Sequence, residues 1–172
     1  MYLWSFITMI KRFLSFLILQ NILHANNYRY ILDRACVQFE PDNPDFIRVS
    51  HRIYDHAAET KSFDALRSTR FFGPMAFYFA WNKNVELLLI DMIQRDLLWE
   101  AINLLQLYQI IHPEMTLDLT NEEEKSEKEL VQILMEFCKT YAKHQYSGQL
   151  ELTIQAYEDA LETEEQNQQQ SS

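Results

Sequence analysis

The chain has very little glycine and proline. Among its 172 residues there are two glycines and four prolines, and Gly73 is the only glycine before residue 148. An all-β fold needs many tight turns, and such turns are rich in these two residues. Their scarcity therefore argues against an all-β architecture and favours an all-α fold.

Cysteines and catalytic motifs are also scarce. Cys36 and Cys138 are too few for a disulfide framework, so we expect two buried thiols in a reducing compartment. There is no glycine-rich phosphate loop and no Gly-x-Ser-x-Gly motif. His51 and His56 are five residues apart, whereas a zinc-binding pair on one helix needs a spacing of four. We therefore expect a protein that is not an enzyme and has no cofactor, no metal and no small-molecule substrate.

An excess of positive charge is missing as well. The formal net charge is −10, and most of it lies near the C-terminus. Residues 117–172 hold 13 acidic and 4 basic residues, whereas residues 1–116 hold 12 acidic and 11 basic residues. Because nucleic-acid-binding proteins usually present a basic surface, strong and non-specific binding of nucleic acid is not expected.

The N-terminal segment, residues 1–26, is strongly apolar and contains no acidic residue. Lys11 and Arg12 lie in its middle, which argues against a single membrane-spanning helix. Three interpretations stay open. The segment is a mitochondrial transit peptide, a signal peptide that begins at Met9 and is cleaved after Ala25, or an N-terminal apolar helix packed on the core. The second interpretation implies a secreted or membrane-attached protein.

Apolar residues recur with helical spacing along the rest of the chain. Helices are predicted over residues 44–59, 74–81, 85–94, 97–111, 120–145 and 149–163, whereas residues 28–39 are ambiguous between helix and strand. Asn43 followed by Pro44 is typical of a helix start. Thr120 and Glu123 match a capping box, and Gly148 is a plausible helix stop.

The predicted architecture is all-α, with antiparallel helix pairs stacked as in helical-repeat proteins. The helices within residues 85–111 are apolar on more than one side, as expected for helices inside a stack or under a partner. We expect a helical-repeat-like core over residues 27–116 and an acidic helical pair over residues 117–163. The glutamine- and glutamate-rich residues 164–172 are predicted to be disordered.

Two surfaces are candidates for binding. The candidate RNA-binding residues are Arg48, Arg52, Arg67 and Arg70, because aromatic residues lie between them and single-stranded RNA is held by cations and aromatic rings. The alternative, which the local charge balance favours, is that the aromatic residues belong to the core and the cations pair with Asp55, Glu59 and Asp64. The candidate partner-binding residues are Leu98, Ile102, Leu105 and Tyr108, on the apolar helices of the centre.

The central block also resembles a known family. The matching segments are Arg52 to Phe63, Phe72-Gly73-Pro74, Leu-Ile-Asp-Met at 89–92 and Trp-Glu-Ala at 99–101. They resemble small animal mitochondrial pentatricopeptide-repeat proteins and a related protein of the small mitoribosomal subunit, over about residues 47–114. The resemblance implies helix pairs stacked in a solenoid, a mitochondrial location and association with RNA or the ribosome. It carries no base-reading residue over to this chain.

These observations favour a non-enzymatic binding protein in mitochondrial RNA metabolism or at the mitoribosome. The partner would be a mitochondrial RNA or a mitoribosomal protein, and the acidic last third favours the protein. One alternative is a helical scaffold that docks a protein partner through the apolar helices at 85–111. The other is the secreted or membrane-attached protein that a signal peptide implies.

Overall fold

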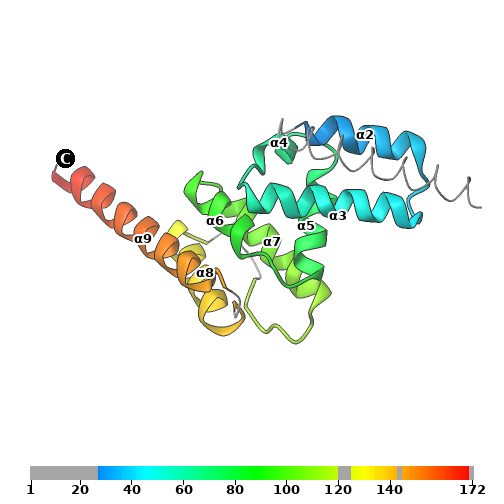
Figure 1. The fold of residues 1–172 in the computed structure, drawn as a ribbon. Helices are drawn as coiled ribbons and strands as arrows, with labels where there is room; N and C mark the ends of the chain where they lie inside the picture. The colour runs from blue at the N-terminus through cyan, green and yellow to red at the C-terminus, as the bar shows by residue number, and fades with distance from the viewer. Residues whose placement is uncertain (1–26, 120–124, 143–144, 171–172) are drawn as a thin grey trace, which may run out of the picture. The chain divides into compact units, whose positions relative to one another are not determined.

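The computed structural model describes residues 27–119, 125–142 and 145–170. Within these ranges the regular elements are helices, and no strand is present, which confirms the predicted all-α class. The helices are α2 (Tyr28–Gln38), α3 (Pro44–Glu59), α4 (Asp64–Arg67), α5 (Phe72–Trp81), α6 (Glu86–Gln94), α7 (Leu98–Ile111), α8 (Glu127–Thr140) and α9 (Ser147–Gln170) (Figure 1). The N-terminal segment and the predicted capping box at Thr120 lie outside the described residues.

The chain divides into two compact units, which we describe separately. The N-terminal unit comprises residues 1–75 and the C-terminal unit comprises residues 76–172, so the boundary falls within α5. The division into four parts made from the sequence stays a prediction.

In the N-terminal unit, α2 and α3 run antiparallel and pack against each other, and α4 packs on α2 (Figure 1). The start of α3 confirms the prediction at Asn43, whose Oδ1 accepts a 2.8 Å hydrogen bond from the backbone N–H of Asp45 while Pro44 occupies the first turn. The ambiguous segment 28–39 is helical. Its buried residues, Tyr28, Ile31, Leu32 and Ala35, follow helical spacing, and the contact with α3 decides in favour of the helix.

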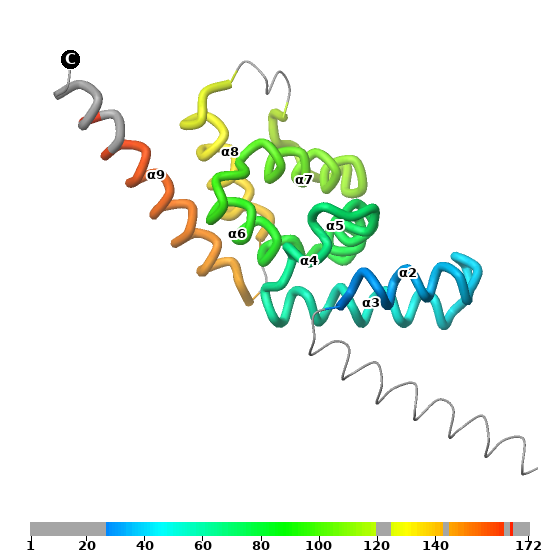
Figure 2. The backbone as a smooth tube through the Cα atoms, turned by 90° about the horizontal axis from the view of Figure 1, so that it is seen from above, coloured from blue at the N-terminus to red at the C-terminus, as the bar shows by residue number. Residues whose placement is uncertain are grey.

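The C-terminal unit is built around α6. This helix packs against α7 and α9, and α8 also packs against α7 and α9, so the four helices form a closed bundle (Figure 2). Every side chain from Glu86 to Ile93 is buried. This agrees with the prediction that the helices apolar on several sides lie inside a stack. Between α7 and α8, the rings of Tyr108 and Phe137 meet edge to face with centroids 5.4 Å apart.

The ends of the last two helices differ from the prediction. Because Ser126 forms a capping box with Glu129, α8 begins at Glu127, and it ends at Thr140.

Gly148 does not stop a helix, since the N–H of Leu150 already donates to the carbonyl of Tyr146 and Gly148 lies in the first turn of α9. The last helix, predicted over 149–163, runs over residues 147–170, because glutamate and glutamine readily extend a helix that has already formed. Disorder over residues 164–172 stays a prediction.

Candidate functional site

The four arginines expected to bind RNA all lie in the N-terminal unit, and each one pairs with a carboxylate. The four nitrogen–oxygen distances are 2.7 Å for Arg48 and Asp45, 3.4 Å for Arg52 and Glu59, 3.3 Å for Arg67 and Asp64, and 2.6 Å for Arg70 and Asp33. Two of these partners, Glu59 and Asp64, are among the three acids that the sequence analysis named as alternative partners of the cations. The arginines are therefore part of a charge-balanced surface.

The same four arginines form two groups. Arg48 and Arg52 lie on the outer face of α3, where the sequence spacing places them one turn apart. Arg67 belongs to α4, and its guanidinium lies 5.3 Å from the ring centre of Phe72. Arg70 lies 4.9 Å from the ring centre of the buried Phe71, so the aromatic rings here already contact cations of the chain.

The residues expected to bind a protein partner are in the core of the C-terminal unit. Leu98, Ile102, Leu105 and Tyr108 are 5% exposed or less. Burial raises the pKa of the Tyr108 phenol, because the ring is enclosed between the helices. These four residues therefore hold the bundle together. Binding of a partner through them stays a prediction, and it would require α7 to separate from its neighbours.

Exposed apolar residues lie elsewhere in the C-terminal unit, and the sequence did not indicate them as a surface for a protein partner. On α5, Phe77 and Trp81 stack with ring centres 5.9 Å apart, and Trp81 is 63% exposed. On α7, Trp99 and Ile110 are exposed on the side opposite the core. The spacing of four between Phe77 and Trp81 was visible in the sequence, but periodicity does not tell an exposed stripe from a buried one.

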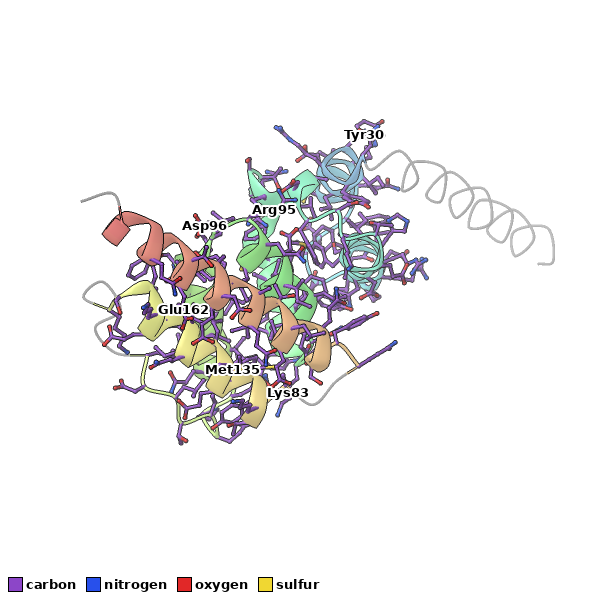
Figure 3. The ribbon with its side chains drawn as sticks, turned by 90° about the vertical axis from the view of Figure 1, so that its left-hand side faces the viewer. Tyr30, Lys83, Arg95, Asp96, Met135 and Glu162 are labelled. Carbon is purple, nitrogen blue, oxygen red and sulfur yellow. The ribbon has the colours of Figure 1, made fainter. Side chains whose placement is uncertain are left out.

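A groove runs along α9 beside the end of α6, and we call it the α9 groove. Its volume is about 420 Å³. It is lined by Ile93, Gln94, Asp96, Gln149, Leu152, Thr153, Ala156, Tyr157 and Ala160. Tyr157 donates a hydrogen bond from its hydroxyl to Oδ1 of Asp96, which lies beside α9 in Figure 3. Leu152 is 67% exposed, so an apolar side chain of this groove faces water.

A second, smaller hollow lies between α8 and α9, with a volume of about 320 Å³. Its lining is mixed, since Val131 and Met135 are apolar whereas Glu136, Lys139 and Glu158 are charged. Figure 3 shows α8 and α9 side by side, with Met135 labelled on α8 and Glu162 on α9. This hollow is less apolar than the α9 groove.

The two cysteines have different surroundings. Cys138 is buried in α8, its thiol donates a 3.4 Å hydrogen bond to the carbonyl of Ser147, and burial raises its pKa. Cys36 is exposed on α2, so the prediction of two buried thiols is wrong for this residue. The reason is that the buried stripe of α2 is centred on Ile31, Leu32 and Ala35, and Cys36 lies at the edge of this stripe, about 90° around the helix from its middle.

The ionisable groups of the described residues serve local structure. His56 Nδ1 lies 2.9 Å from the hydroxyl of Tyr28, and Nε2 of His112 donates a 2.8 Å hydrogen bond to the carbonyl of Ala80. Lys83 and Glu114 pair at 2.7 Å, which raises the pKa of the lysine and lowers that of the glutamate. Burial raises the pKa of Tyr54 to about 12.

The described residues contain no metal site and no helix that could cross a membrane. In the ranges 27–119, 125–142 and 145–170, no group of three or more histidine, cysteine, aspartate or glutamate side chains is placed to hold a metal ion. None of the helices within those ranges is both long enough and apolar enough to cross a bilayer. Three surface features of the described residues are candidates for interaction: the arginines of the N-terminal unit, the exposed aromatic pair and the α9 groove.

Comparisons with known proteins identify relatives over most of the chain. The family model of mitochondrial 28S ribosomal protein S22 matches residues 11–113. The small ribosomal subunit protein mS22 of Bos taurus is 41% identical over 143 residues, and that of Mus musculus is 36% identical over 143 residues. Each alignment covers 83% of this chain and 39% of the relative, so the chain spans about two fifths of the length of these proteins.

The inference from sequence resemblance that the chain is related to pentatricopeptide-repeat proteins is therefore wrong. The matching family model covers nearly all of residues 47–114, on which that resemblance was based, and it describes a different family. The misleading features were the Phe72-Gly73-Pro74 tripeptide, which begins α5, and one pair of apolar helices. Any packed helical hairpin has this spacing of apolar residues, because the spacing follows from helix geometry and not from ancestry.

Proposed function

We propose that this chain, which belongs to the mitochondrial 28S ribosomal protein S22 family, is incorporated into the small subunit of the mitochondrial ribosome. The observation that carries the proposal is the match of both relatives, which are named as small ribosomal subunit proteins, over 83% of the chain. The family also confirms two predictions made from the sequence, namely a mitochondrial location and a protein that is not an enzyme.

The proposed role is structural. A chain that fills its interior mainly with leucine, isoleucine and aromatic side chains, and that keeps most of its charges on the surface, provides a rigid shape with faces for neighbours. Such a chain contributes to a ribonucleoprotein particle by occupying a fixed place and contacting protein or RNA.

Sedimentation of mitochondrial extracts tests this proposal. A tagged copy of the chain, produced in mitochondria, should co-sediment with the RNA of the small ribosomal subunit in a sucrose gradient. As a control, the same chain with the substitution Leu105→Asp should lose this behaviour, because a carboxylate at a fully buried position disrupts the bundle. If the unaltered chain is folded and stays at the top of the gradient, the proposed function is wrong.

We further propose that contact with RNA, where the chain makes it, involves the N-terminal unit. Residues 1–75 hold 9 basic and 7 acidic residues, whereas residues 76–172 hold 6 basic and 18 acidic residues. The ion pairs of Arg48 and Arg52 lie on the surface. Surface pairs of this kind contribute only about 0–1 kcal/mol, so an RNA phosphate can replace the carboxylate as the partner of the arginine.

A binding assay with a short single-stranded RNA tests this second proposal. The double variant Arg48→Ala/Arg52→Ala should weaken binding at low salt and reduce its salt dependence, because each lost phosphate contact lowers the slope by about 1. The matched control is Lys128→Ala/Lys139→Ala, which removes two exposed cations from α8 in the C-terminal unit. Equal weakening by both variants, or no binding by the unaltered chain at low salt, would contradict the proposal.

A further inference from the structure

We propose that the α9 groove binds a basic, amphipathic segment of another protein of the particle. The proposal rests on the proposed function and deepens it, since it names the class of partner and the place of contact. It is carried by the apolar floor of the groove, by the carboxylates at its edges and by the charge of the C-terminal unit.

The floor of the groove is apolar and shallow. Ile93 lies buried at its base, whereas Leu152 stands 67% exposed at its side. Ala156 and Ala160 follow Leu152 at intervals of four residues, so the three side chains form one stripe along α9. Two alanines next to a leucine leave room for the side chains of a neighbouring helix to enter, and covering the stripe would remove apolar surface from water.

Each edge of the stripe carries a carboxylate. Asp96 lies on the side of α6, where the hydroxyl of Tyr157 donates to it. Asp159 is exposed on α9 three residues beyond Ala156, which places it along the other edge. The nearest base in the sequence, Arg95, is engaged by Asp91 at 3.0 Å. An apolar stripe with acids on both sides matches a helix that has an apolar face bordered by lysine and arginine.

The charge of the whole unit decides between protein and RNA as the occupant. Residues 76–172 hold 18 acidic and 6 basic residues, a net charge of −12. A surface of that sign repels phosphate and attracts basic protein. Proteins that contact ribosomal RNA carry an excess of lysine and arginine in order to neutralise phosphates, so neighbours of the required charge are expected in such a particle.

Photo-crosslinking in the intact particle tests the proposal directly. A photoreactive benzoylphenylalanine replaces Leu152 in one tagged chain and the exposed Gln155, which lies outside the groove, in a control chain. The small-subunit fraction is irradiated, and the linked peptides are identified by mass spectrometry. Position 152, and not position 155, should link to a segment of another small-subunit protein that is rich in lysine and arginine.

A pair of substitutions then tests the sign of the occupant's charge. Leu152→Lys and Leu152→Glu remove the same apolar contact from an exposed position, so both chains should fold, which circular dichroism checks. If the occupant is basic, Leu152→Lys should reduce the amount of chain in the subunit fraction about tenfold, and Leu152→Glu clearly less. The same substitutions at Gln155 should leave that amount unchanged.

The outcomes separate this proposal from the proposed function. Linkage of position 152 to RNA or to an acidic segment, no linkage in a chain that co-sediments with the subunit, or equal losses from the lysine and glutamate variants would overturn the docking proposal alone. Failure of the unaltered chain to co-sediment would contradict the proposed function itself, and the docking proposal with it.

Discussion

At the scale of single residues, Tyr28 shows how one buried side chain joins two helices. The residue is fully buried on α2, and its hydroxyl lies 2.9 Å from Nδ1 of His56 and 3.2 Å from Oγ1 of Thr60, both at the end of α3. The ring of Tyr28 also meets the imidazole edge to face, with centroids 5.8 Å apart. A single tyrosine thus supplies apolar burial and two polar contacts across the α2–α3 interface.

The substitution Tyr28→Phe tests this role. It keeps the buried ring but removes the hydroxyl, so the free energy of unfolding should fall by about 1 kcal/mol, as is usual for a lost hydrogen bond between side chains. Urea denaturation followed by circular dichroism measures the change. The matched control is Tyr30→Phe on the same helix, where the side chain is 64% exposed and the effect should stay within about 0.5 kcal/mol. Equal effects would show that the contacts of Tyr28 are not stabilising.

At the scale of elements, the N-terminus of α8 is the best-defined helix end in the described chain. The hydroxyl of Ser126 accepts a hydrogen bond from the N–H of Glu129, and the carboxylate of Glu129 accepts one of 2.7 Å from the N–H of Ser126. The box satisfies two donors that the first turn would otherwise leave without a partner. It therefore decides where α8 begins.

Removal of the cap should destabilise α8. We expect Ser126→Ala to lower the free energy of unfolding by about 1 kcal/mol, because an alanine cannot accept the hydrogen bond from the first turn. Ser126→Asp, which retains an acceptor at that position, should have a much smaller effect. Thermal unfolding of the two variants beside the unaltered chain gives the comparison, and identical losses from both would exclude a capping role.

The same box makes the stability of the chain depend on pH. The N–H and hydroxyl of Ser126 lower the pKa of Glu129 below its ordinary value of 4.5. The stabilisation is therefore complete above about pH 4.5 and is lost as the pH falls through the lower pKa of the folded state. Glu129→Gln should reduce the acid dependence of unfolding below pH 4.5. A series of urea titrations between neutral and acidic pH measures it, and an unchanged slope in the variant would contradict the assignment.

The end of α9 illustrates how far a helix can be predicted from local sequence. Residues 164–170 look disordered by composition, but they continue a helix that Leu150 and Ile154 anchor in the core. A tail of glutamate and glutamine does not start a helix in water by itself, whereas adding residues to an existing helix is easy. The start of the helix depends on tertiary packing, so composition alone does not place its end.

At the scale of the whole molecule, the dominant property is the separation of charge between the two units. The C-terminal unit has a net charge of −12, whereas residues 1–75 hold two more basic than acidic residues. Self-repulsion of this size works against the compact state, and salt screens it. In the proposed ribosomal particle, a basic neighbouring protein would also reduce this repulsion between acidic side chains.

The isolated chain should therefore become more stable in salt. Raising the concentration of potassium chloride from about 0.02 M to about 0.5 M should increase the unfolding temperature of the C-terminal unit by about 2–5 °C. Differential scanning calorimetry measures the shift. The variant Glu158→Gln/Glu162→Gln carries less negative charge on α9 and should show a smaller salt effect. A lower unfolding temperature in salt would mean that attractive ion pairs, and not repulsion, dominate this unit.

The sequence by itself determined most of the helices, though not all of their ends, and the distribution of charge. Asn43 and Pro44 start α3 because they satisfy the local chemistry of a helix start. The run at 87–93 is buried because leucine, isoleucine and methionine occupy every side of the helix, and Asp91 is the one charged residue among them. The acidic character of the C-terminal part follows from a count of residues and needs no coordinates. These properties are local or additive, which is why they can be read from the chain.

Only the tertiary structure decided which faces are covered and which are open. Leu105 and Leu152 are both leucines on helices with apolar stripes, yet one is fully buried in the bundle and the other faces water beside the α9 groove. Periodicity shows which residues share a face of a helix, but the neighbour of that face comes from a distant part of the chain. The pairing of Arg70 with Asp33, 37 residues away, has the same cause: packing between helices sets it, and no local rule contains it.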